Sequence, residues 1–251
     1  MSSSPRIRKI GIFLFWIAVW QIAALLIDNS IVFVGPYPVL RAFCALLPTP
    51  GFWLSVGRSL GKITLGFLVA FICGLATGSL AYHFVLLREF LEPIIRLMKS
   101  VPVASFVILA LIGIGSANLA VFISFLVVFP ILYVNTIAGL ENTDQKLLEM
   151  ARVFSIAPAG RIRCIYLPAL LPYLTSGCRI ALGMSWKSGI AAEVIGVPSH
   201  TIGENLYMAK IYLSTAELLA WTIVIILVSA LFEKLFLFLL EKGVRICFRF
   251  S

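Results

Sequence analysis

The sequence predicts an all-α, polytopic membrane protein with about six transmembrane helices in a single transmembrane domain, residues 1–251. Three observations predict this class. First, 61% of the 251 residues are hydrophobic, and the mean hydropathy is +1.06. Second, only 12% of the residues are charged, about half the share in a soluble domain, so polar surface is too scarce to cover the chain in water. Third, several uncharged runs approach the ~20 residues that cross a bilayer as a helix.

The first two expected spans, Ile10–Ile27 and Ile63–Tyr82, contain no charged residue. Ser100–Leu140 is also uncharged, but it is too long for one crossing. The turn-forming residues Gly113–Asn118 divide it. We therefore expect a short third span at about Val101–Ile112 and a fourth span after the turn.

The fifth and sixth spans are expected at about Pro172–Ile195 and Ala216–Leu240. A secretory signal is the alternative for the first span, because Arg6, Arg8 and Lys9 precede it. Its apolar run exceeds the usual length of about 7–15 residues, and no small-residue cleavage site follows it. We therefore expect a retained membrane anchor.

Basic residues are distributed unevenly between the two sides that these spans define. Most of the 20 Lys and Arg residues fall on one side, whereas loops on the other hold only Arg41 and Lys210. The residues of the basic side are Arg6, Arg8, Lys9, Arg88, Arg96, Lys99, Lys146, Arg152, Arg161, Arg163, Lys242, Arg245 and Arg249. The basic side is the cytoplasmic one, so both termini are expected in the cytoplasm. The net charge of +9 then needs no nucleic acid as a partner, since an anionic membrane surface attracts it.

No cofactor or metal site is expected. The five cysteines show no metal-ligand spacing, and His83 and His200 fall on opposite sides of the predicted membrane. The stretch "GRSLGKIT" (Gly57–Thr64) departs from the phosphate-binding loop in its glycine spacing and in the residue after its lysine.

Small residues recur every four positions on the second span, at Gly66, Ala70, Gly74 and Gly78. Such a face lets two helix backbones approach closely within a membrane. Internal packing is favoured over a contact between subunits, which remains the alternative.

A polar, turn-rich segment interrupts the apolar chain at residues 141–168. Apolar residues at helical spacing, among them Leu147, Leu148, Ala151 and Phe154, predict a helix, and "SIAPAG" ends it. A second short helix follows, which gives a helix–turn–helix. Such a segment suits docking into a groove on a soluble partner or resting at the lipid interface.

The segment resembles the EAA loop of bacterial ATP-binding-cassette (ABC) importer permeases. That pattern is Glu-Ala-Ala, three residues, Gly, nine residues and Ile-x-Leu-Pro, and its spacing fits "EMARVFSIAPAGRIRCIYLP" throughout. Met150 replaces an alanine and Ser155 replaces the glycine. "LPALLPYLTSGCRIALGMSWKSGIAAEVIG" and "IGENLYMAK" are similar to the nitrate/sulfonate/taurine branch, and the resemblance covers roughly residues 10–243.

The resemblance implies a permease of the bacterial inner membrane that pairs with a second permease subunit. It also implies a cytoplasmic ABC ATPase dimer, which performs the ATP hydrolysis, and an extracytoplasmic solute-binding protein. The solute would be a small anion such as a sulfonate, taurine or a nitrate-like compound. The implied ATPase-coupling residues are Glu149, Ala151, Arg152, Phe154, Ser155, Ile165, Leu167 and Pro168.

The fifth span carries Lys187 and Glu193, and charged side chains within a bilayer are candidates for function. With the neighbouring Trp186, they are the candidate residues of the solute pathway. For Lys187, pairing with a carboxylate of the same bundle is favoured over solute contact. The sequence "AAE" at Ala191–Glu193 matches the Ala-Ala-Glu of the same permease family. The resemblance implies that these residues line or gate the solute pathway.

Two other classes of protein remain open. A secondary transporter would normally show paired repeats and interrupted helices, and no convincing repeat is present. A membrane scaffold without transport would leave the spacing of residues 149–168 unexplained.

Overall fold

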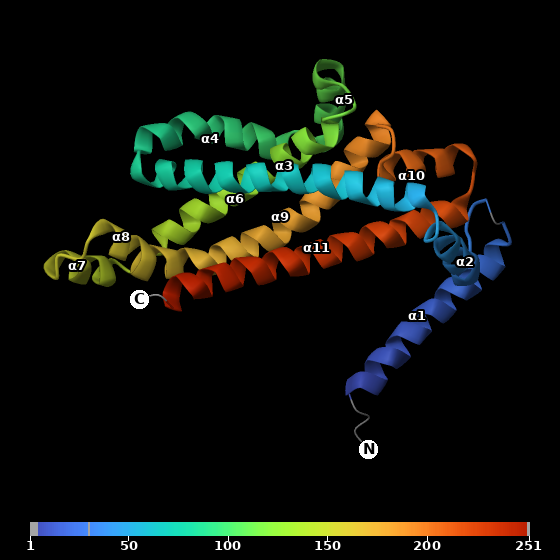
Figure 1. The fold of residues 1–251 in the computed structure, drawn as a ribbon, viewed down its shortest axis with the longest axis horizontal. Coiled ribbons are helices and arrows are strands. Elements are labelled where there is room, and N and C mark those ends of the chain that lie inside the picture. The colour runs from blue at the N-terminus through green and yellow to red at the C-terminus, as the bar shows by residue number, and fades with distance from the viewer. Residues whose placement is uncertain (1–4, 30, 250–251) are drawn as a thin grey trace.

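The computed structural model describes residues 5–29 and 31–249, and every regular element in these residues is a helix (Figure 1). The elements are α1 (Pro5–Ile27), α2 (Pro36–Leu46), α3 (Pro50–His83), α4 (Val85–Ser100), α5 (Val103–Ile114), α6 (Leu119–Glu141), α7 (Gln145–Val153), α8 (Pro158–Arg161), the π-helical turn η1 (Ile162–Tyr166), α9 (Leu167–Gly196), α10 (Ile202–Ile211) and α11 (Thr215–Arg249).

Five of the described helical segments are long and apolar enough to cross a membrane, and a bent pair of helices raises the number to six. The five are Arg8–Ile27, Pro50–His83, Leu119–Glu141, Pro158–Gly196 and Thr215–Gly243. The expected class, an all-α membrane protein of about six spans, is thereby confirmed.

The third expected span differs from its predicted bounds. α5 is long enough to cross a membrane only together with α4, from which it is bent by 104°. Val101 is extended at the bend, with ψ 132°, because the ring of Pro102 disfavours helical backbone in the residue before it. The helix predicted at Val101–Ile112 is therefore the second half of a broken element that begins at Val85.

The central layer of the fold is α6 packed between α3 and α9. The small-residue face of α3 makes this possible. A Cβ added at Gly66 would lie 2.4 Å from the Val121 carbonyl oxygen, and one added at Gly78 would lie 2.8 Å from Cβ of Thr136. The favoured interpretation of this face, internal packing, therefore agrees with the structure.

α1 lies apart from this bundle and contacts mainly α2 (Figure 1). Its link to the following loop is a hydrogen bond from Trp20 Nε1 to the Val34 carbonyl, 2.9 Å. That α1 is retained as a membrane anchor remains a prediction. The position of both termini also remains one, because residues 1–4 and 250–251 lie outside the described residues.

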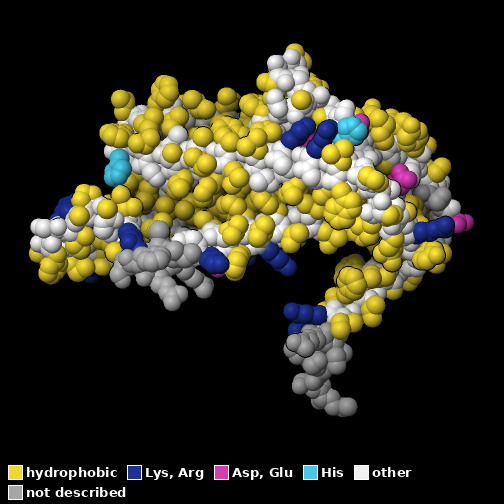
Figure 2. Space-filling model, viewed as in Figure 1, with side chains coloured by type: hydrophobic (Ala, Val, Ile, Leu, Met, Phe, Trp, Pro, Cys, Tyr) yellow, Lys and Arg dark blue, Asp and Glu magenta, His cyan; other side chains and the backbone are white. Residues whose placement is uncertain are grey.

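Hydrophobic side chains cover most of the visible face of the bundle (Figure 2). Lys and Arg side chains lie at the end formed by α7 and α8 and at several other places along the edge of the bundle. This distribution is typical of a bundle with a lipid-facing middle and a charged end in water.

Candidate functional site

The segment 141–168 forms a compact hairpin at one end of the bundle (Figure 1). Its first helix, α7, begins after Asp144, whose side chain accepts a hydrogen bond from the backbone N–H of Lys146, 2.9 Å. This cap satisfies one of the free N–H groups at the helix start. The chain then turns and returns through α8 and η1 into α9.

The hairpin has a small core of its own. Leu148, Ala151 and Ile165 are buried together, with Ile156 and Tyr166 packed against them. Ala151 is fully enclosed, so a small residue is required where α7 approaches the returning chain. The expected apolar stripe is thus divided, since Leu148 and Ala151 face inward while Leu147 and Phe154 are exposed.

The turn depends on a left-handed residue at Ser155, whose φ is +51°. The backbone N–H of Ser155 donates to the Arg152 carbonyl, 3.0 Å, and that of Ile156 donates to the Ala151 carbonyl, 2.9 Å. Glycine adopts this conformation without steric cost, whereas serine does not. Ser155 therefore has the backbone geometry that a glycine would favour at this position.

The outer side of α7 and the turn faces solvent. Glu149 and Arg152 are exposed, and Phe154 is 72% exposed at the C-terminal end of the helix. A large aromatic side chain beside charged groups, without cover from its own chain, is typical of a protein-binding surface. At the return of the hairpin, Leu167 is half-buried and Pro168 is exposed.

The hairpin continues directly into the longest helical segment of the described chain, Pro158–Gly196, with 39 residues. Only the π-helical turn η1, at Ile162–Tyr166, interrupts its α-helical geometry. π-helical turns inside α-helices are frequent at functional sites. One continuous helical segment therefore joins the hairpin to the opposite end of the bundle.

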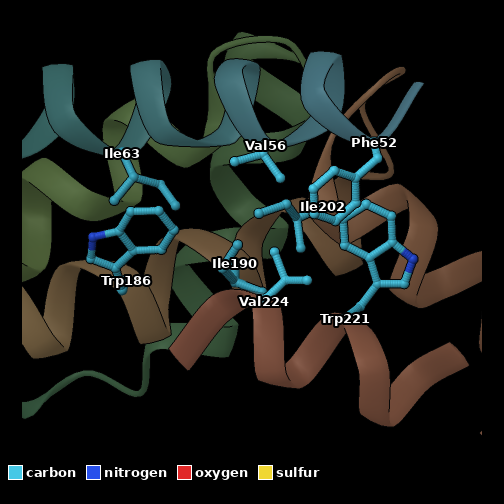
Figure 3. Close-up of a cluster of buried hydrophobic side chains, with 8 residues drawn as sticks. All are labelled: Phe52, Val56, Ile63, Trp186, Ile190, Ile202, Trp221 and Val224. Atoms are coloured by element: carbon cyan, nitrogen blue, oxygen red, sulfur yellow. The ribbon is translucent and has the colours of Figure 1, made fainter. Parts of the chain in front are cut away.

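At that opposite end, buried side chains from four helices meet (Figure 3). Trp186 of α9 lies beside Ile63 of α3 and is 2% exposed. Ile202 of α10 and Trp221 of α11 complete the contact between helices. Trp186, a predicted pathway residue, therefore fills the interior of the bundle in the structure.

Glu193 is also enclosed, with 0% of its surface exposed. Its Oε2 accepts hydrogen bonds from the Ser59 hydroxyl, 2.7 Å, and from the backbone N–H of Gly203, 3.1 Å. Ser59 Oγ in turn accepts a hydrogen bond from the N–H of Ile202, 2.9 Å. Glu193 and Ser59 thus bind the first N–H groups of α10, where the helix dipole also favours a negative charge.

Gly203 permits this contact. A Cβ at position 203 would lie 2.2 Å from Cβ of Glu193 and 2.5 Å from its backbone carbon, closer than atoms can approach. α10 is also held to α3 by Asn205, whose Nδ2 donates to Ser55 Oγ, 3.0 Å. These residues form a polar junction of α3, α9 and α10, defined here as Ser55, Ser59, Glu193, Gly203 and Asn205.

Sequence reasoning identified Glu193 but not its partners. Ser59 is 134 positions away in the chain. It lies in Gly57–Thr64, the stretch that departs from the phosphate-binding loop. The available signal was the pair Thr201 and Glu204, a threonine and a glutamate that mark the start of a helix. The hydroxyl of Thr201 does accept from the N–H of Glu204, 3.2 Å.

Lys187 is exposed, unlike Trp186 and Glu193, the other two predicted pathway residues. It lies on one side of α9 with Ser176, Arg179 and Ala191, which are also exposed. Half-buried Gly183 lies midway between Arg179 and Lys187, four residues from each. The ion pairs Arg88–Glu141 and Arg96–Glu92 lie elsewhere, on α4 and α6, and Lys187 has no carboxylate partner among the described residues. In the same residues, no group of three or more His, Cys, Asp or Glu side chains is placed to hold a metal ion.

Residues 63–246 match the model of one protein family, the binding-protein-dependent transport system inner membrane component. Among curated proteins, the putative aliphatic sulfonates transport permease SsuC of Bacillus subtilis is 29% identical over 90% of this chain and 82% of its own length. The taurine transport system permease TauC of Escherichia coli is 28% identical over 90% and 81%. The nitrate import permease NrtB of Leptolyngbya laminosa is 32% identical over 57% of this chain, and the match spans 52% of that protein.

Among solved structures, the chain resembles the MetNI methionine ABC transporter in its inward-facing conformations. The superposition covers 79% of this chain and 98% of the solved chain, with a TM-score of 0.60 and 19% sequence identity. A second crystal form gives a TM-score of 0.57. At this identity the likeness establishes the fold.

Proposed function

The chain belongs to the family of binding-protein-dependent transport system inner membrane components, and we propose that it is the permease subunit of an ABC importer. It acts as a pair of identical subunits, driven by a cytoplasmic ABC ATPase dimer and supplied by an extracytoplasmic solute-binding protein. The family supports this role, as do the relatives that carry sulfonates and taurine.

One structural observation carries the mechanism. The continuous helical segment Pro158–Gly196 joins the exposed hairpin at one end to the buried carboxylate of Glu193 at the other. ATP-driven closure of the ATPase dimer moves the hairpin through Glu149, Arg152 and Phe154. The segment then shifts relative to α3, and Glu193 carries α10 with it. This alternation opens and closes the outer end of the pathway.

The solute is a small anion of the sulfonate, taurine or nitrate type. Arg179 and Lys187 occupy this exposed side of α9, and a cation facing lipid at the centre of a helix costs about 2.5–3.5 kcal/mol. This side therefore faces water or a second permease subunit rather than lipid. A positive pathway attracts an anion electrostatically, which agrees with the nitrate and sulfonate named for the relatives.

The protein lies in the bacterial cytoplasmic membrane with its hairpin and both termini on the cytoplasmic side. Single cysteines at Thr49 and Ser199 are expected to react with an impermeant thiol reagent in intact cells, on a background without native cysteines. A cysteine at Ser155 is expected to react only after the membrane is opened. Labelling of position 155 in intact cells would overturn this orientation.

The importer is tested by reconstitution with a candidate ABC ATPase and a candidate solute-binding protein from the same organism. Uptake is expected to require ATP, the ATPase and the binding protein together. Uptake that follows an ion gradient without the ATPase would identify a secondary transporter instead, and stable membrane insertion without any uptake would favour a scaffold.

A further inference from the structure

A cavity of about 290 Å³ with both charged and apolar lining lies between α4 and α6, away from the junction and the hairpin core. Arg88, Arg96 and Lys99 contribute three cations to its lining, and Glu92 and Glu141 contribute two carboxylates. The proposed transport mechanism uses none of these residues.

The charges of this cavity do not cancel. Arg88 forms an ion pair with Glu141, and Arg96 forms one with Glu92. Each carboxylate therefore already has a cationic partner. Lys99 has no partner among the described residues, so the cavity retains one uncompensated positive charge.

A buried hydroxyl adds a second, independent observation. Tyr133 of α6 lines the same cavity and is 4% exposed, yet its hydroxyl has no hydrogen-bond partner. A buried hydroxyl normally has a partner, so its donor is available to a ligand once the side chains that enclose the oxygen move aside.

The surroundings of the cavity resemble those of a lipid site. On α4, Ile94 and Leu97 are exposed apolar side chains beside the charged residues of the cavity. They offer a surface to acyl chains. Basic pockets between transmembrane helices bind anionic lipid headgroups.

We propose that the cavity between α4 and α6 binds an oxyanion of the phosphate type, carried by an anionic phospholipid or free in solution. Lys99 supplies the charge, Arg96 supplies guanidinium donors, and the Tyr133 hydroxyl donates to one oxygen. Arg88 exchanges part of its contact with Glu141 for the bound oxyanion.

The test uses the full-length protein in detergent and follows its thermal unfolding. Three probes are titrated separately: dioleoylphosphatidylglycerol, dioleoylphosphatidylcholine and inorganic phosphate. Saturable stabilisation by the anionic lipid but not by the zwitterionic lipid is expected. If phosphate alone produces the same saturable shift, the source is the free anion; if only the lipid does so, the source is the headgroup.

Two variants and a control locate the site. Lys99→Gln is expected to weaken binding of the stabilising probe about tenfold, the typical value of one charged hydrogen bond. Tyr133→Phe is expected to weaken binding while the unliganded protein unfolds at an unchanged or higher temperature, because its hydroxyl has no protein partner to lose. Lys210→Gln removes the same charge at the other end of the bundle and is the control.

The proposal is wrong if the two lipids stabilise the protein equally and phosphate has no effect. It is also wrong if Lys99→Gln binds the probe as the Lys210→Gln control does. Should Lys99→Gln fail to fold, unchanged binding by Tyr133→Phe would overturn the proposal by itself.

Discussion

At the hairpin end of Pro158–Gly196, Glu149 and Phe154 face outward, whereas at the other end Glu193 is enclosed and hydrogen-bonded to two further helices. The hairpin buries only a small core and leaves Glu149, Arg152 and Phe154 exposed. At the junction, Glu193 Oε2 and the side chains of Ser59 and Asn205 form hydrogen bonds within the chain. One end thus exposes its side chains to solvent, and the other holds α10 against α3 and α9.

This difference makes separate predictions for the two ends. Changes at the junction are expected to act on stability, since they disturb buried contacts. Changes at the hairpin are expected to act on coupling, since their side chains touch solvent in the isolated chain. The comparison fails if a junction variant changes coupling without changing stability, or if a hairpin variant changes stability without changing coupling.

The largest effect is expected at the junction from Gly203→Ala. The added Cβ meets Cβ and the backbone of Glu193, so α10 must move away from α9. Overpacking of this kind costs typically about 1–3 kcal/mol, and the backbone contact places this variant at the upper end. Thermal or denaturant unfolding of the purified permease measures it.

The matched control is Gly61→Ala on α3, where an added Cβ meets nothing within 4 Å. This change is expected to leave stability unchanged or to raise it by up to about 1 kcal/mol, because alanine favours the helix more than glycine does. Equal losses in the two variants would show that α10 is not held by close contact with Glu193.

The second effect concerns the exposed side of α9. Lys187→Met is expected to raise the KM for an anionic solute about tenfold, in line with the loss of one charged contact. Assembly and thermal stability are expected to stay unchanged, because Lys187 has no carboxylate partner among the described residues. Reconstituted uptake and size-exclusion chromatography measure the two quantities.

A loss of assembly in Lys187→Met would instead indicate pairing with a carboxylate of another subunit, since breaking a buried ion pair is strongly destabilising. Lys210→Met is the control, because Lys210 also lies at an exposed position but near the end of α10. Unchanged uptake and assembly together would remove Lys187 from the pathway.

The third effect belongs to the hairpin. Glu149→Lys reverses an exposed charge on α7 and is expected to change stability by less than about 0.5 kcal/mol. It is nevertheless expected to reduce the ratio of solute uptake to ATP turnover several-fold, because the reversed charge disturbs the contact with the ATPase. Both activities are measured on one reconstituted preparation.

The control for this charge reversal is Glu217→Lys, at an exposed position in the first turn of α11. Coupling is expected to remain normal there. If Glu149→Lys leaves assembly, ATP turnover and uptake at the unmodified level, Glu149 is not a coupling residue.

The two ends also differ in how far the sequence predicts them. The hairpin follows from local spacing, since its turn, its polar flanks and its apolar positions lie within residues 141–168. The long spans follow from uncharged runs, because hydrocarbon excludes charge. Both kinds of signal are contained in a short window of sequence.

The junction and the broken third span depend on distant contacts and could not be predicted in this way. Glu193 suggested a pathway residue because a charge in a span is a functional candidate, while its partner Ser59 lies on another helix. α4 was missed because its charges, among them Arg88 and Glu92, end any search for uncharged runs. Its apolar residues at helical spacing were the signal that remained.

The smallest effect is expected from Ser155→Gly at the tip of the hairpin. Ser155 has a φ of +51°, a conformation that costs a residue with a Cβ roughly 1–2 kcal/mol. Glycine removes this cost but raises the entropy of the unfolded chain, so the net gain in stability is expected to be about 0.5–1 kcal/mol. Uptake and ATP turnover are expected to be retained, because the Ser155 side chain is exposed and the turn keeps its backbone hydrogen bonds. Ser155→Val is the matched control: a β-branched residue is strongly disfavoured at positive φ, so stability and coupling should both fall. If Ser155→Gly destabilises the protein, or if valine is tolerated as well as glycine, the turn does not hold the left-handed geometry on which the outward face of the hairpin depends.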